Sequence, residues 1–133
     1  MYLAHTIPSR QRGVSMIGFL FLGAVAIMLA LLAMKLVPAY VEFFSVKRVL
    51  FTMGQDADLR SKSNAEIRRD FSRRAGVAYV TVVKPEDISI DRRGGVPVIS
   101  TDYAFRTKLI GNVSLVVDFS ASSDPNAVPP SIE

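Results

Sequence analysis

The densest group of side chains that could bind a ligand is a cluster of four arginines in the middle of the chain. They are Arg68, Arg69, Arg73 and Arg74. Guanidinium groups bind phosphate and carboxylate strongly, so this cluster could contact lipid phosphates or an acidic partner. Glu66 and Asp70 lie at helical pairing distances from three of these arginines, so the default interpretation is a solvated, internally paired helix face.

Side chains that commonly perform catalysis are scarce. The chain has no cysteine, and its one histidine, His5, lies near the N-terminus. A zinc site or a Ser-His relay in a folded domain would have to be built without these residue types. Asp102 and Asp118 are the only carboxylates in the predicted long strands, and both fall on the polar face, where solvent exposure or a cross-strand ion pair is expected. We therefore predict that the protein is not an enzyme and has no catalytic, cofactor-binding or metal site.

The formal net charge of +4 is concentrated around an apolar segment. Arg10, Arg12 and Lys35 border residues 14–34, whereas residues 36–133 hold 13 Lys and Arg against 12 Asp and Glu, a net charge of +1. The basic balance therefore reflects the flanks of the apolar segment. It gives no support to nucleic-acid binding.

The apolar segment itself, residues 14–34, contains 21 consecutive residues without an ionisable side chain. As a helix it would be about 31 Å long, against about 30 Å for the hydrocarbon core of a bilayer. Only a helix satisfies every backbone polar group of such a segment in lipid, so we predict one transmembrane helix. A cleaved secretory signal is the alternative, but its apolar region is usually shorter and ends in a small-residue cleavage site rather than at Lys35.

The predicted domain organisation follows from this helix. Residues 1–13 form a short basic leader, residues 35–121 a small folded domain, and the Pro- and Ser-rich residues 122–133 a disordered tail. Two basic residues precede the helix and three follow it nearby, so charge counting alone does not decide the orientation. The N-terminal amine adds positive charge before the helix, and the acidic Glu42 offsets positive charge after it. We therefore expect a cytoplasmic N-terminus and an exported domain.

Small residues recur within the predicted transmembrane helix. Gly23, Ala26, Ala30 and Ala33 are spaced by 3, 4 and 3 residues, which places them along one stripe. Such a stripe lets a helix of a second copy or of another envelope protein approach closely in lipid. The alternative is that Gly and Ala are present only because they are common in membrane helices.

A short motif, RGVSMIGFL, occupies residues 12–20 at the start of the apolar segment. It resembles the N-terminal segment of type IV pilins and pseudopilins, in which a basic leader ends in glycine and is removed. The resemblance implies cleavage between Gly13 and Val14. The glutamate that this family carries at the fifth mature position is Gly18 here, which departs from the pattern that registers subunits in a filament.

A longer motif combines the RG-x-S-x-I-G pattern with residues after the apolar segment. They are Lys35, Leu36, Pro38, Tyr40, Glu42, Phe44, Ser45, Val46 and Lys47, and later Gly111, Asn112 and Val113. This order is similar to that of an uncharacterised proteobacterial family of short single-span proteins, domain of unknown function 4845. The resemblance implies a bacterial inner-membrane protein with a small periplasmic domain, and it implies no activity.

Two further helices are predicted after the membrane segment. Residues 35–53 have the apolar spacing of an amphipathic helix that ends at Gly54, with a kink or a break near Pro38. A capping box opens another helix over residues 64–75, which Gly76 should end. Its predicted core residues are Ile67, Phe71 and Ala75. The aromatic residues of the first of these helices would lie either at the membrane interface or in the domain core; they are Tyr40, Phe43 and Phe44.

The C-terminal half changes to the alternating pattern of strands. Strands are predicted at residues 77–83, 88–90, 96–106 and 113–120, joined by a hairpin turn at 92–95 and a second connection at 107–112. These elements predict an α+β domain with a mostly antiparallel four-strand sheet and helices on one face.

The first hypothesis for function is a non-enzymatic single-pass membrane protein whose periplasmic domain and small-residue stripe bind other envelope proteins or a second copy. The second is a pilin-like subunit processed after Gly13. An enzyme or small-ligand receptor is disfavoured, because residues 36–133 lack His, Cys and Trp. The expected partners are therefore membrane lipid and protein.

Overall fold

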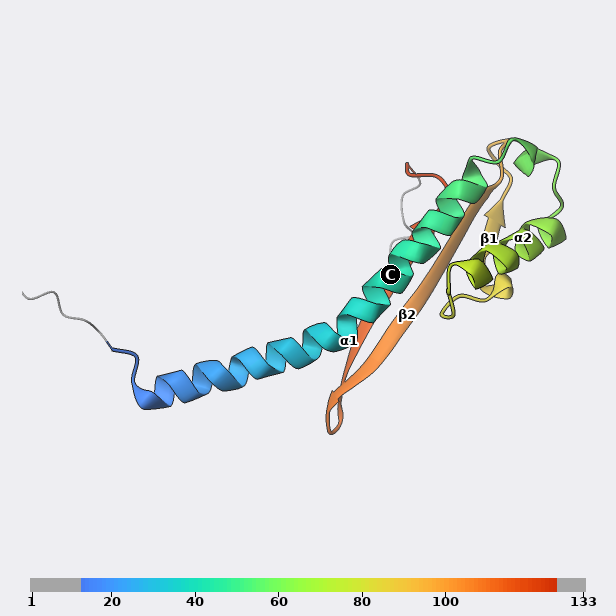
Figure 1. Cartoon of the computed structure of the whole chain (residues 1–133). Coiled ribbons are helices and arrows are strands. Elements are labelled where there is room, and N and C mark those ends of the chain that lie inside the picture. Colours follow the sequence, from blue (N-terminus) through green and yellow to red (C-terminus); the bar gives the residue numbers. More distant parts are fainter. Residues whose placement is uncertain (1–12, 127–133) are drawn as a thin grey trace, which may run out of the picture. The chain divides into compact units, whose positions relative to one another are not determined.

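The computed structural model describes residues 13–126. The predicted leader, apart from Gly13, and the last seven residues of the predicted tail lie outside the described residues. The chain divides into two units, residues 1–33 and residues 34–133, which are described separately below (Figure 1).

The first long element is the helix α1, Met16–Gly54. Ser15 caps its start, because its Oγ accepts the backbone N–H of Gly18 at 3.1 Å and its carbonyl accepts that of Phe19 at 2.9 Å. The helix ends at Gly54, as the sequence predicts, and it continues through Pro38, so of the predicted kink or break the break is absent. A proline removes only one hydrogen bond of the ladder, and long helical runs on both sides tolerate this loss.

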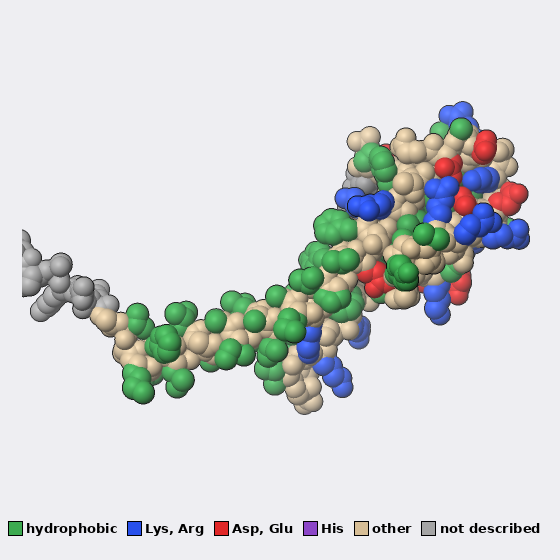
Figure 2. Space-filling view, viewed as in Figure 1, with side chains coloured by type: hydrophobic (Ala, Val, Ile, Leu, Met, Phe, Trp, Pro, Cys, Tyr) green, Lys and Arg blue, Asp and Glu red, His purple; other side chains and the backbone are tan. Residues whose placement is uncertain are grey.

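The first unit contains the N-terminal part of α1, and its side chains are hydrophobic and exposed. Figure 2 shows these hydrophobic side chains along the helix surface. Among the described residues, α1 is the one helix that is long and apolar enough to cross a membrane. This finding suggests a membrane location, since exposed apolar side chains over this length are unfavourable in water.

The second unit has an α+β fold. After α1 come a short 3-10 helix η1 (Ala57–Arg60), the helix α2 (Asn64–Val77), a second 3-10 helix η2 (Pro85–Asp87), and the strands β1 (Ser89–Asp91), β2 (Val98–Ile110) and β3 (Val113–Ser122). The predicted capping box opens α2: Ser63 Oγ accepts the Glu66 N–H at 3.3 Å, and the Glu66 carboxylate accepts the Ser63 N–H at 2.6 Å.

The sheet has three strands in the order β1-β2-β3, all antiparallel (Figure 1). The predicted turn at residues 92–95 joins β1 to β2, and Gly95 takes a positive φ of 86° there. The predicted connection at residues 107–112 is shorter than expected. Because β2 keeps pairing with β3 as far as Ile110, only Gly111 and Asn112 remain for the turn.

The disordered tail was predicted to begin at residue 122, but the sheet extends past this point. Ser122 ends β3, and the buried Ser123 follows it. The N–H of Ser123 donates to the Ile99 carbonyl at 2.8 Å, and its Oγ accepts the Ile99 N–H at 2.9 Å. The folded domain therefore includes these two serines.

The predicted fourth strand, residues 77–83, is absent: Val77 ends α2, and residues 78–83 form a loop. The first residues of this loop terminate α2. The N–H of Val80 donates to the Ala75 carbonyl at 2.9 Å, and the N–H of Tyr79 donates to the Gly76 carbonyl at 3.4 Å. These bonds form a Schellman motif, with Tyr79 at the left-handed position (φ 55°). Gly76, the predicted terminator, stays within the helix.

The hydrophobic core of this unit lies between α1, α2 and the sheet. The C-terminal half of α1 contributes Val46, Val49, Leu50 and Met53, and α2 contributes the predicted residues Ile67, Phe71 and Ala75. The sheet adds Ile99 and Ala121, and the loops add Leu59, Val80, Val83 and Ile88. Burial of each large apolar side chain stabilises the fold by about 1.5–3 kcal/mol before entropy losses, so this cluster is what holds α2 and the hairpin to α1.

Candidate functional site

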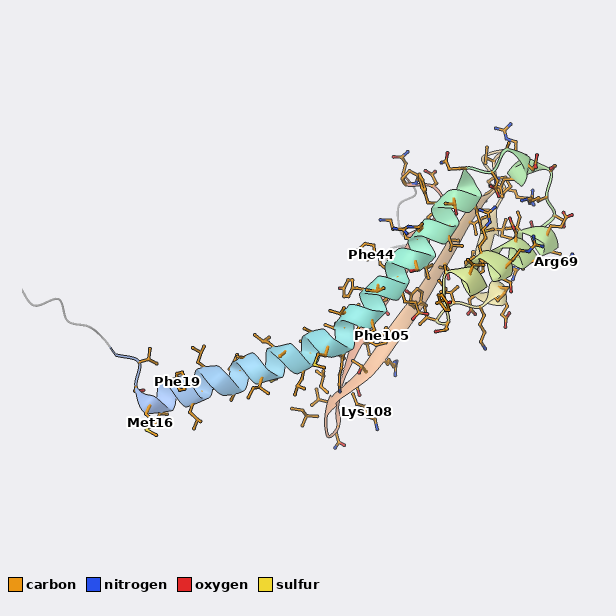
Figure 3. All side chains as sticks on the ribbon, viewed as in Figure 1. Met16, Phe19, Phe44, Arg69, Phe105 and Lys108 are labelled. Carbon is orange, nitrogen blue, oxygen red and sulfur yellow. The ribbon has the colours of Figure 1, made fainter. Side chains whose placement is uncertain are left out.

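Exposed apolar side chains of the second unit form a stripe along α1, which we call the outer stripe. It consists of Val37, Val41, Phe44 and Phe51, whose side chains are 57%, 60%, 60% and 47% exposed. Spacings of 4, 3 and 7 residues place all four on one face of the helix. Figure 3 shows Phe44 projecting from the side of α1 away from β2. About half of the surface of each residue is left uncovered by the described part of the chain, which is typical of a surface that binds another molecule.

The opposite face of α1 holds the hairpin through aromatic contacts. The ring of Phe119 on β3 lies 4.8 Å from that of Phe43, 5.2 Å from that of Tyr40 and 5.4 Å from that of Tyr103. Such pairs stabilise packing beyond the area that they bury. The sequence left open whether three aromatic residues of this helix lie at the membrane interface or in the domain core. Phe43 and Tyr40 pack against the hairpin of the domain, whereas Phe44 belongs to the outer stripe.

Tyr103 has a buried hydroxyl without a hydrogen-bond partner among the described residues. Burial raises the pKa of this phenol to about 12, and the negative charge of Glu42 contributes in the same direction. The group is therefore neutral at physiological pH, and it offers neither a nucleophile nor a base.

Glu42 connects α1 to the loop that replaces the predicted fourth strand. Its Oε1 accepts three hydrogen bonds, from the Thr81 N–H at 2.5 Å, the Thr81 hydroxyl at 2.8 Å and the Val82 N–H at 3.0 Å. The backbone donors that a strand would give to a sheet neighbour are thus satisfied by one carboxylate, 39 residues away in sequence from Thr81. Glu42 is half-buried and engaged, and we assign it a structural role.

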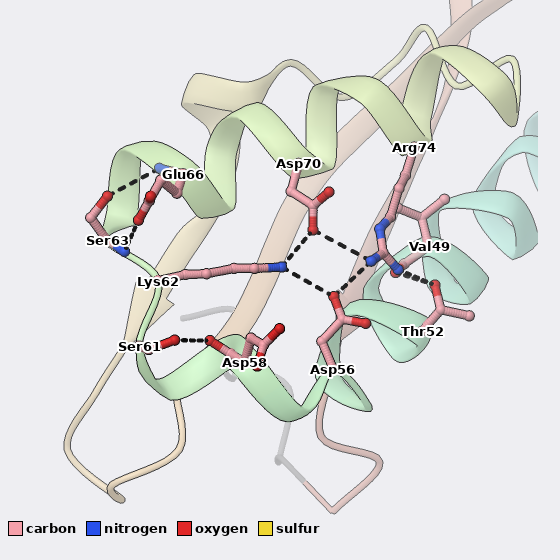
Figure 4. A network of polar contacts seen from close by, with 10 residues as sticks. All are labelled: Val49, Thr52, Asp56, Asp58, Ser61, Lys62, Ser63, Glu66, Asp70 and Arg74. Carbon is pink, nitrogen blue, oxygen red and sulfur yellow. Dashed lines mark hydrogen bonds and ion pairs between the residues drawn. The ribbon is translucent and has the colours of Figure 1, made fainter.

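A network of four charges joins the end of α1 to α2 (Figure 4). Lys62 Nζ lies 3.5 Å from Asp56 and 3.2 Å from Asp70, and Arg74 Nη2 lies 2.6 Å and 3.4 Å from the same two carboxylates. The hydrogen bond to Asp70 raises the pKa of Lys62. Burial opposes ionisation of Asp70, but the hydrogen bond from Lys62 and the charge of Arg74 lower its pKa overall. The charges balance, so the network stabilises the fold and leaves no free charge for a ligand.

The arginine cluster predicted from the sequence is divided between structural and exposed positions. Arg74 belongs to the charge network, and Arg68 Nη1 donates to the carbonyls of Pro85 and Glu86 at 3.3 and 3.2 Å. Arg69 and Arg73 are exposed and pair with no carboxylate in residues 13–126. Only these last two remain open to a lipid phosphate or an acidic partner.

The other predicted site residues lie on exposed surfaces. Gly23, Ala26, Ala30 and Ala33 are all exposed in the first unit, and Gly13 and Val14 precede the start of α1, also exposed. Asp102 and Asp118 are exposed on the outer face of the hairpin, and neither has an ion-pair partner within residues 13–126. In the described part of the chain, no group of three His, Cys, Asp or Glu side chains could hold a metal ion.

The sequence analysis missed the outer stripe, although a signal was present. Val37, Phe44 and Phe51 recur every seven residues, and the same spacing continues back to Ala30 and Gly23. A seven-residue repeat of apolar or small residues is the pattern of helices that pair along their length. No sequence signal marked the contact of Glu42 with its loop, because it joins distant segments.

Comparison with known proteins gives one match. The model of a family described as a domain of unknown function (DUF4845) matches residues 35–119. The match begins directly after the apolar segment and ends at Phe119, so it covers most of the second unit. No curated protein and no solved structure matches the chain.

Proposed function

The chain belongs to the DUF4845 family, and from this premise we propose that it is a non-enzymatic single-pass membrane protein whose outer stripe binds a helix of another envelope protein or of a second copy. The observation that carries the proposal is the exposure of Val37, Val41, Phe44 and Phe51 beyond residues 14–34. Phe44 and Phe51 lie ten or more residues beyond the segment that would occupy the lipid, so neither the bilayer nor the domain core covers these two side chains. A partner helix beside α1 would bury them.

The proposal includes a location and an orientation in the membrane. The N-terminal part of α1 crosses the bacterial inner membrane, with the N-terminus in the cytoplasm and the α+β domain in the periplasm. The seven-residue spacing of the outer stripe continues in sequence to Ala30 and Gly23, so one partner helix could follow α1 from the lipid into the periplasm. The protein would then be part of, or accessory to, an envelope assembly.

Crosslinking in cells tests the proposal. A photo-crosslinking amino acid placed at position 44 of the full chain reports what lies against that position. We expect a discrete crosslinked product from position 44 and none from the control position Ser72, which is exposed on α2. A product of twice the chain mass identifies a second copy, and any other discrete mass identifies a different protein. Equal crosslinking at both positions, or none, would contradict the proposal.

A matched pair of variants adds a functional measurement. Introducing a charge by Phe44→Lys should abolish the product formed from a crosslinker at Val41, because Lys47 and Arg48 on the next turn offer no partner and burial of an unpaired charge is costly. Ser72→Lys should leave that product unchanged. Both variants change exposed residues, so both should keep the midpoint of thermal unfolding of the parent chain.

The second candidate function is a pilin-like subunit that is processed after Gly13. The motif at residues 12–20 favours it, whereas Gly18 in place of the glutamate argues against filament formation. Mass spectrometry of the mature protein separates the two candidates. A chain that starts at Val14 supports processing, and an intact N-terminus excludes it.

A further inference from the structure

The end of the β2–β3 hairpin carries exposed apolar side chains at its turn. We call residues 109–113 the hairpin tip. Ile110 is 71% exposed and Val113 is 60% exposed, and they face each other across the turn formed by Gly111 and Asn112. Gly111 has a positive φ of 52°, which keeps the turn tight. Turns of hairpins that face only water are normally polar, so an apolar pair at this position requires a cause.

The direction of the hairpin explains where the tip lies. Phe119 packs against Phe43 and Tyr40, and its strand partner is Tyr103. After Tyr103, β2 runs antiparallel to the C-terminal part of α1, towards Lys35. There, Lys35 Nζ donates a hydrogen bond to the Lys108 carbonyl. Figure 3 shows Lys108 beyond Phe105 near the turn of the hairpin.

Lys35 is the residue that directly follows the apolar segment 14–34. Its contact with Lys108 therefore places that part of the hairpin at the level where the apolar part of α1 ends. Ile110, in the hairpin tip, lies two residues beyond Lys108 on β2, which is about 7 Å along the strand. If residues 14–34 cross a bilayer, Lys35 lies at the level of the head groups, and this short separation from Lys108 keeps Ile110 and Val113 within reach of the head groups, where interfacial apolar side chains are buried.

The charges near the tip fit the same surface. Arg106 and Lys108 are exposed on β2, and neither forms an ion pair with any residue between 13 and 126. From Tyr103 to Val117 the sequence contains no Asp or Glu, so the distal hairpin has a charge of +2, and Lys35 adds a third cation beside it. Long basic side chains next to apolar ones are typical of membrane interfaces, because the charged ends reach lipid phosphates.

We propose that the hairpin tip inserts into the head-group region of the same bilayer that α1 crosses. The inference rests on the proposed membrane-spanning role of α1. The tip is then a second membrane contact, through Ile110 and Val113, and Arg106 and Lys108 bind the lipid phosphates. Two separated contacts restrict the rotation of the domain about α1, so they hold the outer stripe in one orientation for a partner.

Fluorescence quenching by lipids tests the insertion directly. Because the chain has no cysteine, Ile110→Cys and Val113→Cys each provide a single attachment site for an environment-sensitive fluorophore such as nitrobenzoxadiazole. The full chain is reconstituted into vesicles of phosphatidylcholine and phosphatidylglycerol, with or without lipids that carry a nitroxide quencher near the head group. Label at the tip should lose about half of its emission with the quencher, as expected for side chains at interfacial depth.

Two control positions separate the inference from the proposed function. Ile27→Cys, read with a nitroxide on the lipid acyl chain because this position would lie near the bilayer centre, reports whether residues 14–34 are in the bilayer. Ser72→Cys on α2 reports the background at an exposed site of the domain. Quenching at positions 27, 110 and 113 but not at 72 supports the insertion. Quenching at 27 alone overturns the insertion and leaves the membrane-spanning role intact. Absence of quenching at 27 contradicts the proposed function, and the insertion with it.

A pair of variants tests the role of the cations. Lys108→Glu together with Arg106→Glu should reduce tip quenching in vesicles with phosphatidylglycerol at least twofold, because the distal hairpin changes from a charge of +2 to −2. Arg60→Glu with Lys84→Glu makes the same change of charge at exposed positions elsewhere in the domain and should leave tip quenching unchanged. An equal effect of both pairs would show that only net charge matters and would overturn the assignment of phosphate contacts to the hairpin.

Discussion

Replacement of Glu42 should release the loop at residues 81–82 from α1. In the folded domain one carboxylate oxygen accepts two backbone N–H groups and one hydroxyl, at 2.5 to 3.0 Å. Glu42→Ala removes this acceptor, and the two backbone donors lose their only protein partner among the described residues. Glu42→Gln keeps an amide oxygen in place but removes the negative charge, so it should preserve part of the interaction.

The expected change in the free energy of unfolding depends on how exposed Thr81 and Val82 are. A hydrogen bond to a charged group contributes about 1.5–3 kcal/mol when it is buried. Thr81 is exposed and Val82 is half-buried, so water can replace part of what is lost. We therefore expect Glu42→Ala to lower the free energy of unfolding by about 1.5 kcal/mol, and Glu42→Gln by about half of this. Local opening of the loop should become about tenfold more frequent, since 1.4 kcal/mol corresponds to a factor of ten.

Two measurements on the full chain in detergent micelles check this prediction. Thermal unfolding reports the change in global stability, and amide hydrogen exchange reports the opening of residues 81–82. Glu86→Ala is the matched control, because its exposed side chain forms no polar contact within residues 13–126. If exchange at residues 81–82 is unchanged in Glu42→Ala, or is accelerated equally in Glu86→Ala, then Glu42 does not hold the loop.

Three further predictions concern single contacts of the second unit. Tyr103→Phe should raise the free energy of unfolding by about 1 kcal/mol, because it removes a buried hydroxyl without a partner while keeping the ring; absorbance titration should also lose the phenol with a pKa of about 12. Asp70→Asn should destabilise the chain at neutral pH. Because folding lowers the pKa of this carboxyl, its contribution is present above the unfolded pKa of about 4 and is lost as pH falls through the folded value, so denaturation curves of variant and parent should converge in acid. Gly54→Ala should cost about 1–3 kcal/mol, since a Cβ there would lie 3.0 Å from both Cβ and the carbonyl oxygen of Ser123; an unchanged melting temperature would show that this close approach relaxes freely.

Patterns that depend on neighbouring residues were predicted well. The helix end at Gly54, the capping box of α2, its core face and the hairpin turn at residues 92–95 all agree with the structure. Each is determined within one or two turns of helix or within a few strand residues, because side-chain spacing and backbone preference act locally. Of the kink or break predicted near Pro38, the break was wrong, because the local cost of proline was outweighed by the helix around it.

The errors and omissions involve contacts between distant segments. Residues 77–83 have the composition of a strand, but a strand also needs a neighbour, and here Glu42 satisfies the backbone N–H groups of residues 81 and 82 instead. Similarly, helical spacing offered partners on α2 to three of the four arginines, yet only folding places Arg74 against Asp56 and Arg68 against the carbonyls of η2. Composition cannot indicate which member of a cluster will find a partner.

The sequence alone determined an apolar helix of membrane-spanning length and an α+β domain after it, because hydrophobicity and periodicity are properties of the chain itself. The tertiary structure decided which apolar side chains stay exposed. Packing of one face of α1 against the hairpin leaves Val41 and Phe44 outside, and the direction of β2 brings the hairpin tip to the level of Lys35. These surfaces arise only when segments far apart in sequence meet, since burial is defined by the neighbours that folding supplies.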